Sequence, residues 1–106
     1  MRAILLAAGL GTRLRPITNK IPKCLVPING KPLIDYWLEQ LTEAGIEKFL
    51  INTHYLHHQV ETYIERSIFA DMVNLVYENE LLLTGGTVIA NKDFIGDESF
   101  MLVHAD

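Results

Sequence analysis

A continuous apolar run at residues 3–8, which ends in a pair of glycines, constrains the fold of this chain more than any other feature. The run reads Ala-Ile-Leu-Leu-Ala-Ala and stops at Gly9 and Gly11. A short apolar run bounded by glycines predicts a β-strand that is buried on both faces. Strands of this kind occur in parallel sheets that are covered by helices, so the run favours an α/β fold.

Periodicity along the rest of the chain predicts further helices and strands in alternation. The first helix is expected to begin at Pro32 and to end at Gly45, with an apolar face toward the core. Residues 16–31 contain three of the four prolines and are expected to be irregular. Alternating elements indicate βαβ units and a parallel sheet. The remaining expected elements are strands at residues 48–53, 72–77 and 100–103 and helices at residues 56–68 and 84–91.

In a parallel sheet of this kind, ligands bind beyond the carboxyl ends of the strands. The segments expected at that edge are the glycine loop, His54 and Tyr55, residues 78–86 and residues 104–106. We expect His57 and His58 to be solvated polar residues at the start of the second helix. Adjacent side chains on a helix should not share a metal ion as residues four positions apart can.

Composition bounds the classes of function. A chain of 106 residues with 49% hydrophobic residues is expected to form one globular domain. Its net charge of -4 argues against nucleic acid as a partner. The single cysteine, Cys24, cannot form an internal disulfide, which favours a reducing, cytoplasmic setting. The chain contains no apolar run of about 20 residues, so no membrane partner is expected.

The glycine loop has two interpretations when it is taken alone. Gly9 and Gly11 allow a tight turn whose backbone N–H groups converge on phosphate oxygens, and Arg13 adds positive charge. A plain turn between a strand and a helix explains the same glycine pair. Leu14 stands where a dinucleotide fingerprint would place its third glycine, which argues against an NAD-dependent enzyme, and the loop also lacks the Gly-Lys-Ser/Thr ending of a Walker A motif.

Longer strings of sequence carry a resemblance that extends over the whole chain. They are Leu-Ala-Ala-Gly-Leu-Gly-Thr-Arg-Leu-Arg-Pro-Ile-Thr from Leu6, Ile-Pro-Lys-Cys-Leu-Val-Pro-Ile, Gly-Lys-Pro-Leu-Ile, Glu-Leu-Leu-Leu-Thr-Gly-Gly-Thr and the terminal Val-His-Ala-Asp. Together they closely resemble the N-terminal signature of the sugar-1-phosphate nucleotidyltransferases, the NDP-sugar pyrophosphorylases. The resemblance implies a three-layer, Rossmann-like parallel sheet with helices on both faces. It also implies that residues 1–106 are the nucleotide-binding part, with the C-terminal sugar-binding part absent.

Members of this family transfer a nucleoside monophosphate from a nucleoside triphosphate to a sugar 1-phosphate and release pyrophosphate. The resemblance implies that Arg13 contacts the departing pyrophosphate and that Lys23 stabilises charge at the α-phosphate. Asp106 matches an aspartate that binds Mg²⁺ together with a second aspartate, and this chain lacks the second one. The expected nucleotide-binding residues of the loop are Leu6, Ala7, Ala8, Gly9, Gly11 and Thr12.

Residues 78–86 resemble the base-reading loop of the family, with Glu78, Thr84 and Gly85 as expected substrate contacts. Leu83 departs from the family pattern because it replaces a glycine. An ionised Glu78 can only accept hydrogen bonds, which suits the adjacent N1–H and amino group of guanine. We therefore hypothesise GTP and mannose 1-phosphate as substrates. The alternative interpretation of Glu78 is a surface residue in an acidic run.

The expected partners are thus a nucleoside triphosphate and a sugar 1-phosphate. Without the sugar-binding part and the second metal ligand, the chain by itself is expected to show little or no turnover. A second hypothesis is a nucleotide-binding or regulatory module, which forms a homo-oligomer that covers an exposed edge of the sheet.

Overall fold

The computed structural model describes residues 1–82, 84–96 and 99–105. Within these residues, four parallel strands form a sheet in the order β5-β4-β1-β6. Strand β1 (Arg2–Leu6) lies between β4 (Lys48–Thr53) and β6 (Phe100–His104), and β5 (Val73–Tyr77) is the edge strand next to β4. The parallel α/β fold predicted from the sequence is confirmed.

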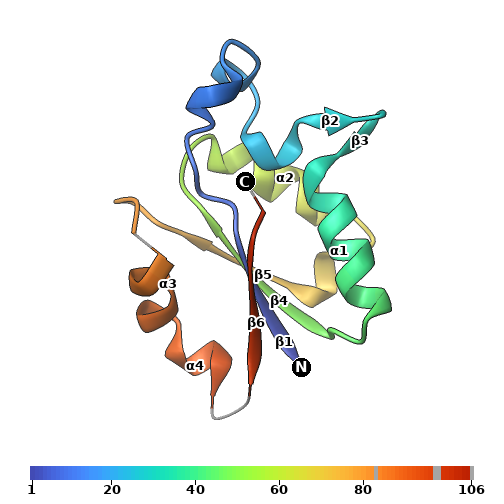
Figure 1. Ribbon diagram of the computed structural model, residues 1–106, viewed down its shortest axis with the longest axis vertical. Helices are drawn as coiled ribbons and strands as arrows, with labels where there is room; N and C mark the ends of the chain where they lie inside the picture. Colours follow the sequence, from blue (N-terminus) through green and yellow to red (C-terminus); the bar gives the residue numbers. More distant parts are fainter. Residues whose placement is uncertain (83, 97–98, 106) are drawn as a thin grey trace.

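Helices cover both faces of the sheet (Figure 1). Helices α1 (Leu33–Glu43) and α2 (His57–Glu65) lie on one face, and α3 (Thr84–Ala90) and α4 (Lys92–Ile95) lie on the other. Successive side chains of a strand point to opposite faces. Ala3 and Leu5 therefore pack with the first pair of helices, and Ile4 and Leu6 pack with the second pair. Burial on both faces is the reason why the first strand is continuously apolar.

Strand β1 ends at Leu6, two residues earlier than the apolar run predicts. The backbone N–H of Ala7 donates a hydrogen bond to the side-chain Oδ1 of Asn52, at 2.6 Å, instead of to a strand carbonyl. Ala7 and Ala8 remain buried although they lie outside the strand. Apolar character thus predicted their burial correctly, but not their backbone hydrogen bonding.

The proline-rich segment is more regular than predicted. It contains the 3₁₀ turns η2 (Ile17–Asn19) and η3 (Lys23–Leu25), which follow η1 (Thr12–Leu14), and a short hairpin of β2 (Pro27–Ile28) and β3 (Lys31–Pro32). Asn29 and Gly30 connect these two strands with φ angles of 53° and 78°. Asn-Gly is a preferred sequence for a two-residue hairpin turn. The prediction of an irregular segment is wrong at this hairpin, because it overlooked the Asn-Gly signal.

Most differences between the predicted and observed elements are at their ends. Pro32 precedes α1 as its N-cap residue instead of occupying its first turn. Helix α2 stops three residues before the predicted end, and Ile68 is 90% exposed. The short turn η4 (Ala70–Met72) delays the start of β5 by one residue, and α4 was not predicted. No described helix is long and apolar enough to cross a membrane.

Candidate functional site

The glycine loop lies at the point where the strand order of the sheet reverses. From β1, the chain passes to β4 and β5 on one side and only later to β6 on the other side. In open α/β sheets, ligands bind beyond the carboxyl ends of the strands at such a reversal. Leu6 at the end of β1 pairs with Asn52 of β4 and with His104 of β6. The loop that follows Leu6 therefore begins at the position expected for a ligand site.

Gly11 is the residue that shapes this loop. Its φ of 66° lies in the left-handed region, which favours glycine. A Cβ atom at this position would lie 2.7 Å from Cγ2 of Thr18. Thr18 is fully buried, and its hydroxyl donates to the carbonyl oxygen of Gly11 at 2.5 Å. Both the backbone conformation and the close approach of Thr18 thus require glycine.

Two side chains that follow β4, the strand paired with β1, hold the segment after the loop. The hydroxyl of Tyr55 donates to the carbonyl oxygen of Thr18 at 2.7 Å. The side-chain amide of Gln59, in the first turns of α2, donates to the carbonyl oxygen of Lys20 at 2.7 Å. The basic residues of this segment are therefore carried on a backbone that is tied to β4 and α2.

A hollow of about 220 Å³ lies beside the loop and has a basic lining. Two of its lining residues, Arg13 and Lys23, are cations. The chain has a net charge of -4, yet its first acidic residue is Asp35, and six of its nine lysine and arginine residues precede that position. Positive charge is thus concentrated locally, as a triphosphate site requires. The lining residues are Gly9, Gly11, Thr12, Arg13, Leu14 and Lys23.

A second hollow of about 170 Å³ adjoins the first, and the two share Gly9. The described residues of its lining include no Lys, Arg, Asp or Glu and provide both apolar side chains and hydrogen-bonding groups. A cavity of this kind suits a nucleoside better than a phosphate group. Its lining residues are Leu6, Ala8, Gly9, Asn52, Leu81, Leu82, Thr84, Thr87 and His104.

A buried hydrogen-bond network stands behind the second hollow. Asn52 accepts from the N–H of Ala7 and donates to Oε2 of Glu78 at 3.3 Å and to Oγ1 of Thr87 at 3.4 Å. The hydroxyl of Thr87 donates to the same Glu78 oxygen at 2.7 Å. The network joins the loop to β4, to the end of β5 and to α3. Sequence reasoning missed Asn52 and Thr87, although a polar residue within the apolar string Phe-Leu-Ile-Asn was a signal for the first of them.

Glu78 is 5% exposed, so its interpretation as a surface residue is wrong. Its other carboxylate oxygen, Oε1, accepts from the backbone N–H of Leu82 at 3.2 Å. Its backbone N–H donates to the carbonyl oxygen of Thr53 at 2.7 Å, and its carbonyl oxygen accepts from Nδ1 of His54 at 2.6 Å. Glu78 thus braces the second hollow from behind and is not one of its lining residues.

The structure brings together most of the site residues that the sequence predicts. Arg13, Lys23 and the loop residues Gly9, Gly11 and Thr12 line the first hollow, and Leu6, Ala8 and Thr84 line the second. Ala7 and Gly85 line neither, and the N–H of Ala7 is bonded to Asn52. Asp106, the predicted Mg²⁺ ligand, and Leu83 lie outside the described residues. Among the described residues, the lining of the basic hollow contains no carboxylate.

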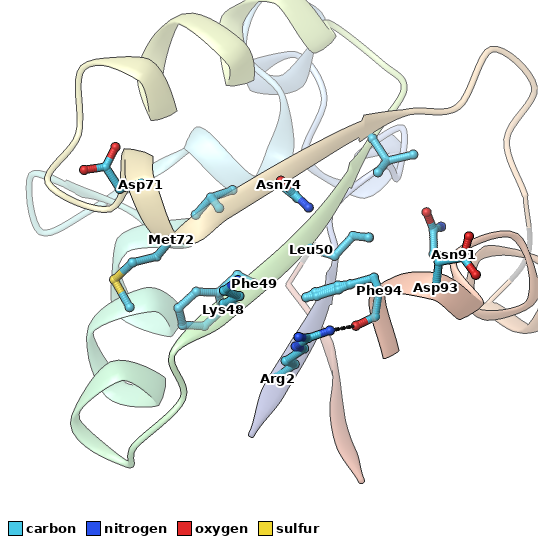
Figure 2. Close-up of a pocket in the computed structure, with 12 residues that line it drawn as sticks. Arg2, Lys48, Phe49, Leu50, Asp71, Met72, Asn74, Asn91, Asp93 and Phe94 are labelled. Atoms are coloured by element: carbon cyan, nitrogen blue, oxygen red, sulfur yellow. Dashed lines mark hydrogen bonds between the residues drawn. The ribbon is translucent and has the colours of Figure 1, made fainter. Parts of the chain in front are cut away.

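A larger hollow, of about 460 Å³, lies at the opposite end of the sheet (Figure 2). It opens between the first residues of β1, β4 and β5 and the helix α4, where Arg2 donates to the carbonyl oxygen of Phe94. In the described part of the chain, its lining contains two basic residues, Arg2 and Lys48, and two acidic residues, Asp71 and Asp93. These charges balance, so this hollow lacks the positive charge that a triphosphate needs.

Comparison with known proteins gives consistent matches. A family model described as nucleotidyl transferase matches residues 2–106. The D-glycero-alpha-D-manno-heptose 1-phosphate guanylyltransferase of Aneurinibacillus thermoaerophilus is 33% identical over 106 residues, which cover 100% of this chain and 46% of that protein. The N-acetylmuramate alpha-1-phosphate uridylyltransferase of Caulobacter vibrioides is 50% identical over 108 residues, which cover 98% of this chain and 45% of that protein.

The solved structure of the CTP:phosphocholine cytidylyltransferase from Streptococcus pneumoniae has the same fold. The two chains match with a TM-score of 0.81 and 36% sequence identity over 99% of this chain and 44% of that chain. The chain therefore spans a little under half the length of each of these three relatives.

Proposed function

This chain belongs to the nucleotidyl transferase family, and we propose that it forms the nucleotide-binding part of an enzyme that makes an NDP-sugar from a nucleoside triphosphate and a sugar 1-phosphate. The observation that carries the proposal is the pair of adjoining hollows on either side of Gly9. One hollow is basic and has the character needed for phosphates, and the other has the character needed for a nucleoside. A nucleoside triphosphate has the same two parts in the same order.

The proposed chemistry is an in-line displacement at phosphorus. An oxygen of the sugar 1-phosphate forms a bond to the α-phosphorus, and the bond from that phosphorus to the oxygen bridging the α- and β-phosphates breaks. Pyrophosphate leaves with the bonding electrons, so no proton transfer to or from the protein is needed. Catalysis then depends on positioning and on neutralising charge, which is the role of Arg13 toward the pyrophosphate and of Lys23 toward the α-phosphate.

Magnesium is part of the proposal. Asp106 would hold it together with oxygens of the triphosphate, since Mg²⁺ in such sites takes one or two carboxylates and several phosphate or water oxygens. The bound ion would supply charge neutralisation to the phosphates. The side chains of the basic hollow then contribute the remaining positive charge.

The finer proposal concerns the substrates, GTP and mannose 1-phosphate. The names of the relatives above specify guanylyl, uridylyl and cytidylyl transfer, so they do not indicate one base. The proposal for the base therefore rests on the residues of this chain. A carboxylate has about four acceptor positions, and three protein donors already bond to Glu78. Guanine needs two adjacent acceptors. Recognition of guanine by Glu78 therefore requires the hydrogen bond from the N–H of Leu82 to open when GTP binds.

Two further points belong to the same proposal. A cytoplasmic enzyme agrees with a chain that has one cysteine and uses soluble phosphate substrates. Self-association through β6 is the proposed oligomeric state, because β6 is an edge strand among the described residues and its Met101 and Leu102 are 38% and 37% exposed.

Calorimetry with nucleoside triphosphates and Mg²⁺ tests the proposal on the 106-residue chain. We expect GTP to bind, and we expect Arg13→Ala and Lys23→Ala each to weaken binding by about tenfold or more, because each removes a charged hydrogen-bond donor to phosphate. The matched controls are Arg15→Ala and Lys20→Ala, which change the same residue types outside the lining of the basic hollow. Equal losses in the control and test variants, or no binding of any triphosphate, would rule the proposal out.

Base preference and turnover need separate measurements. Glu78→Gln should shift the preference from GTP toward UTP or dTTP, and an unchanged preference would remove the guanine proposal only. Pyrophosphate release from GTP, Mg²⁺ and mannose 1-phosphate measures turnover directly. Binding without release would identify the chain as a nucleotide-binding module that lacks catalytic activity by itself.

A further inference from the structure

Two histidines and one glutamate meet at the start of α2, outside both hollows of the nucleotide site. Nδ1 of His57 lies 3.0 Å from Oε1 of Glu61, and Nδ1 of His58 lies 3.4 Å from Oε2 of the same carboxylate. The three ligand atoms lie within 4.8 Å of one another. The expectation that these adjacent histidines should not share a metal ion considered the two histidines alone and not Glu61. Glu61 lies four positions after one and three positions after the other, which brings it to both.

Packing orients this cluster. The ring of His57 stacks on Tyr77 at the end of β5, with a distance of 4.0 Å between the ring centroids. The ring of His58 lies 4.0 Å from that of His57, measured between centroids. The side chain of His57 is 23% exposed and that of Glu61 is 33% exposed, while that of His58 is 86% exposed. His57 is thus held in place by the sheet, and the open side of the cluster faces solvent through His58.

We propose that His57, His58 and Glu61 bind a divalent transition-metal ion of the Zn²⁺ class. Two imidazole nitrogens and one carboxylate suit Zn²⁺, Ni²⁺ or Cu²⁺, whereas Mg²⁺ prefers oxygen ligands. In a tetrahedral zinc site with bonds of about 2.0–2.1 Å, neighbouring ligand atoms lie about 3.4 Å apart. The observed separations, 3.0 Å from His57 to Oε1 of Glu61 and 3.4 Å from His58 to Oε2, are close to this spacing, and a small rotation of the carboxylate would bring one oxygen to both imidazoles. Water would complete the coordination on the exposed side.

The cluster lies outside both hollows of the proposed nucleotide site, because none of its three residues lines the basic hollow or the nucleoside hollow. It lies on the same helix as Gln59, whose side chain holds the carbonyl oxygen of Lys20 in the segment that carries the catalytic lysine. A metal ion across the first turn of α2 would therefore stiffen a helix end that supports the phosphate-binding segment.

Calorimetry of the 106-residue chain with Zn²⁺ tests the inference, with Co²⁺ absorption spectra as a second readout of nitrogen ligation. We expect one ion to bind per chain. We expect His58→Ala and Glu61→Gln each to weaken Zn²⁺ binding by about tenfold or more, because each removes one of three ligands. Glu65→Gln, an exposed carboxylate one turn further along α2, is the matched control and should bind as the original chain does.

His54 and His104 remain in every variant, so binding that is lost with His58 cannot be adventitious binding to those histidines. The exposure of His58 makes its replacement compatible with folding, and circular dichroism checks this. An excess of Mg²⁺ should not displace Zn²⁺. Unchanged Zn²⁺ affinity in His58→Ala and Glu61→Gln, or no Zn²⁺ binding to the original chain, would overturn the proposal. Neither result bears on nucleotide binding.

Discussion

At the scale of single residues, Gly11 and Thr18 form one unit. The glycine adopts a left-handed backbone, and the buried threonine occupies the space where a side chain would stand. The loop motif predicts that Gly11 contacts a ligand. Its packing shows a second role, because the absence of a side chain lets the loop lie against Thr18. Replacing each glycine by alanine separates two contributions to the loss of stability, the left-handed backbone and the overlap with Thr18. Gly30 serves as the reference, because it shares the left-handed backbone with Gly11 but has no close neighbour. Its φ is 78°, and a Cβ atom added there would meet no other atom within 4 Å.

Gly11→Ala is expected to lower the free energy of unfolding by about 2–4 kcal/mol, through left-handed backbone strain and overlap with Thr18. Gly30→Ala should lower it by only about 1–2 kcal/mol, since strain alone acts there. Urea denaturation measures both values. Equal losses would show that the contact with Thr18 carries no cost.

A second residue-level prediction concerns Asn52. Asn52→Leu removes the acceptor of the Ala7 N–H and one donor to Glu78, which leaves buried polar groups without partners. We expect a loss of about 2–4 kcal/mol in the free energy of unfolding. The matched control is Thr53→Val on the same strand, where the hydroxyl makes one long bond of 3.4 Å to the carbonyl oxygen of Val76. That replacement should cost less than about 1 kcal/mol, and a similar cost for both would contradict the importance of the network.

At the scale of elements, α1 and α2 are joined by a hydrogen bond from the phenol of Tyr63 to the carboxylate of Asp35. Burial, followed by this bond, raises the pKa of Tyr63 well above its ordinary value of about 10. The folded chain therefore retains the phenolic proton at pH values where the unfolded chain releases it. The resulting stability is fully present below pH of about 10 and is lost as the pH rises toward the folded pKa.

Ultraviolet titration of tyrosinate, compared between the original chain and Tyr63→Phe, isolates the titration of Tyr63. We expect its midpoint to lie above the ordinary tyrosine value, and we expect Asp35→Asn to move the midpoint down, because the charged acceptor is lost. A midpoint near 10 in the original chain would show that the two helices are not coupled through this bond.

At the scale of the whole molecule, the sheet is covered unevenly. In the described residues, β6 is an edge strand with apolar side chains exposed on both faces, and Ile89 of α3 is 64% exposed. Exposed apolar edges favour association with another chain. We expect sedimentation velocity to show concentration-dependent association of the 106-residue chain. Leu102→Lys should reduce this association, whereas Ile68→Lys, at a position 90% exposed and away from β6, should not. A chain that stays monomeric at every concentration would exclude the proposed self-association.

The local pattern of apolar and polar residues was sufficient to predict most of the helices and strands of this fold. Three stretches each predicted their element, because strand and helix periods are visible within a few residues. They are the apolar run before Gly9, the one-sided apolar pattern before Gly45 and the string Lys48–Thr53. The loop motif also led to the family, and the basic and neutral hollows lie where the motif residues indicated. The hairpin at Asn29 and Gly30 was predictable too, but its turn signal was overlooked among the prolines.

By itself, the sequence determined the alternation of strands and helices, the parallel sheet and the family of the chain. Only the tertiary structure decided which polar groups meet. Asn52 bonds to residues 45, 26 and 35 positions away, and the contact of Gly11 with Thr18 depends on how the chain folds back. The meeting of His57 with Tyr77 depends on the neighbouring strands β4 and β5. Periodicity is a property of adjacent residues, whereas such partners are chosen by the packing of elements that are distant in the chain.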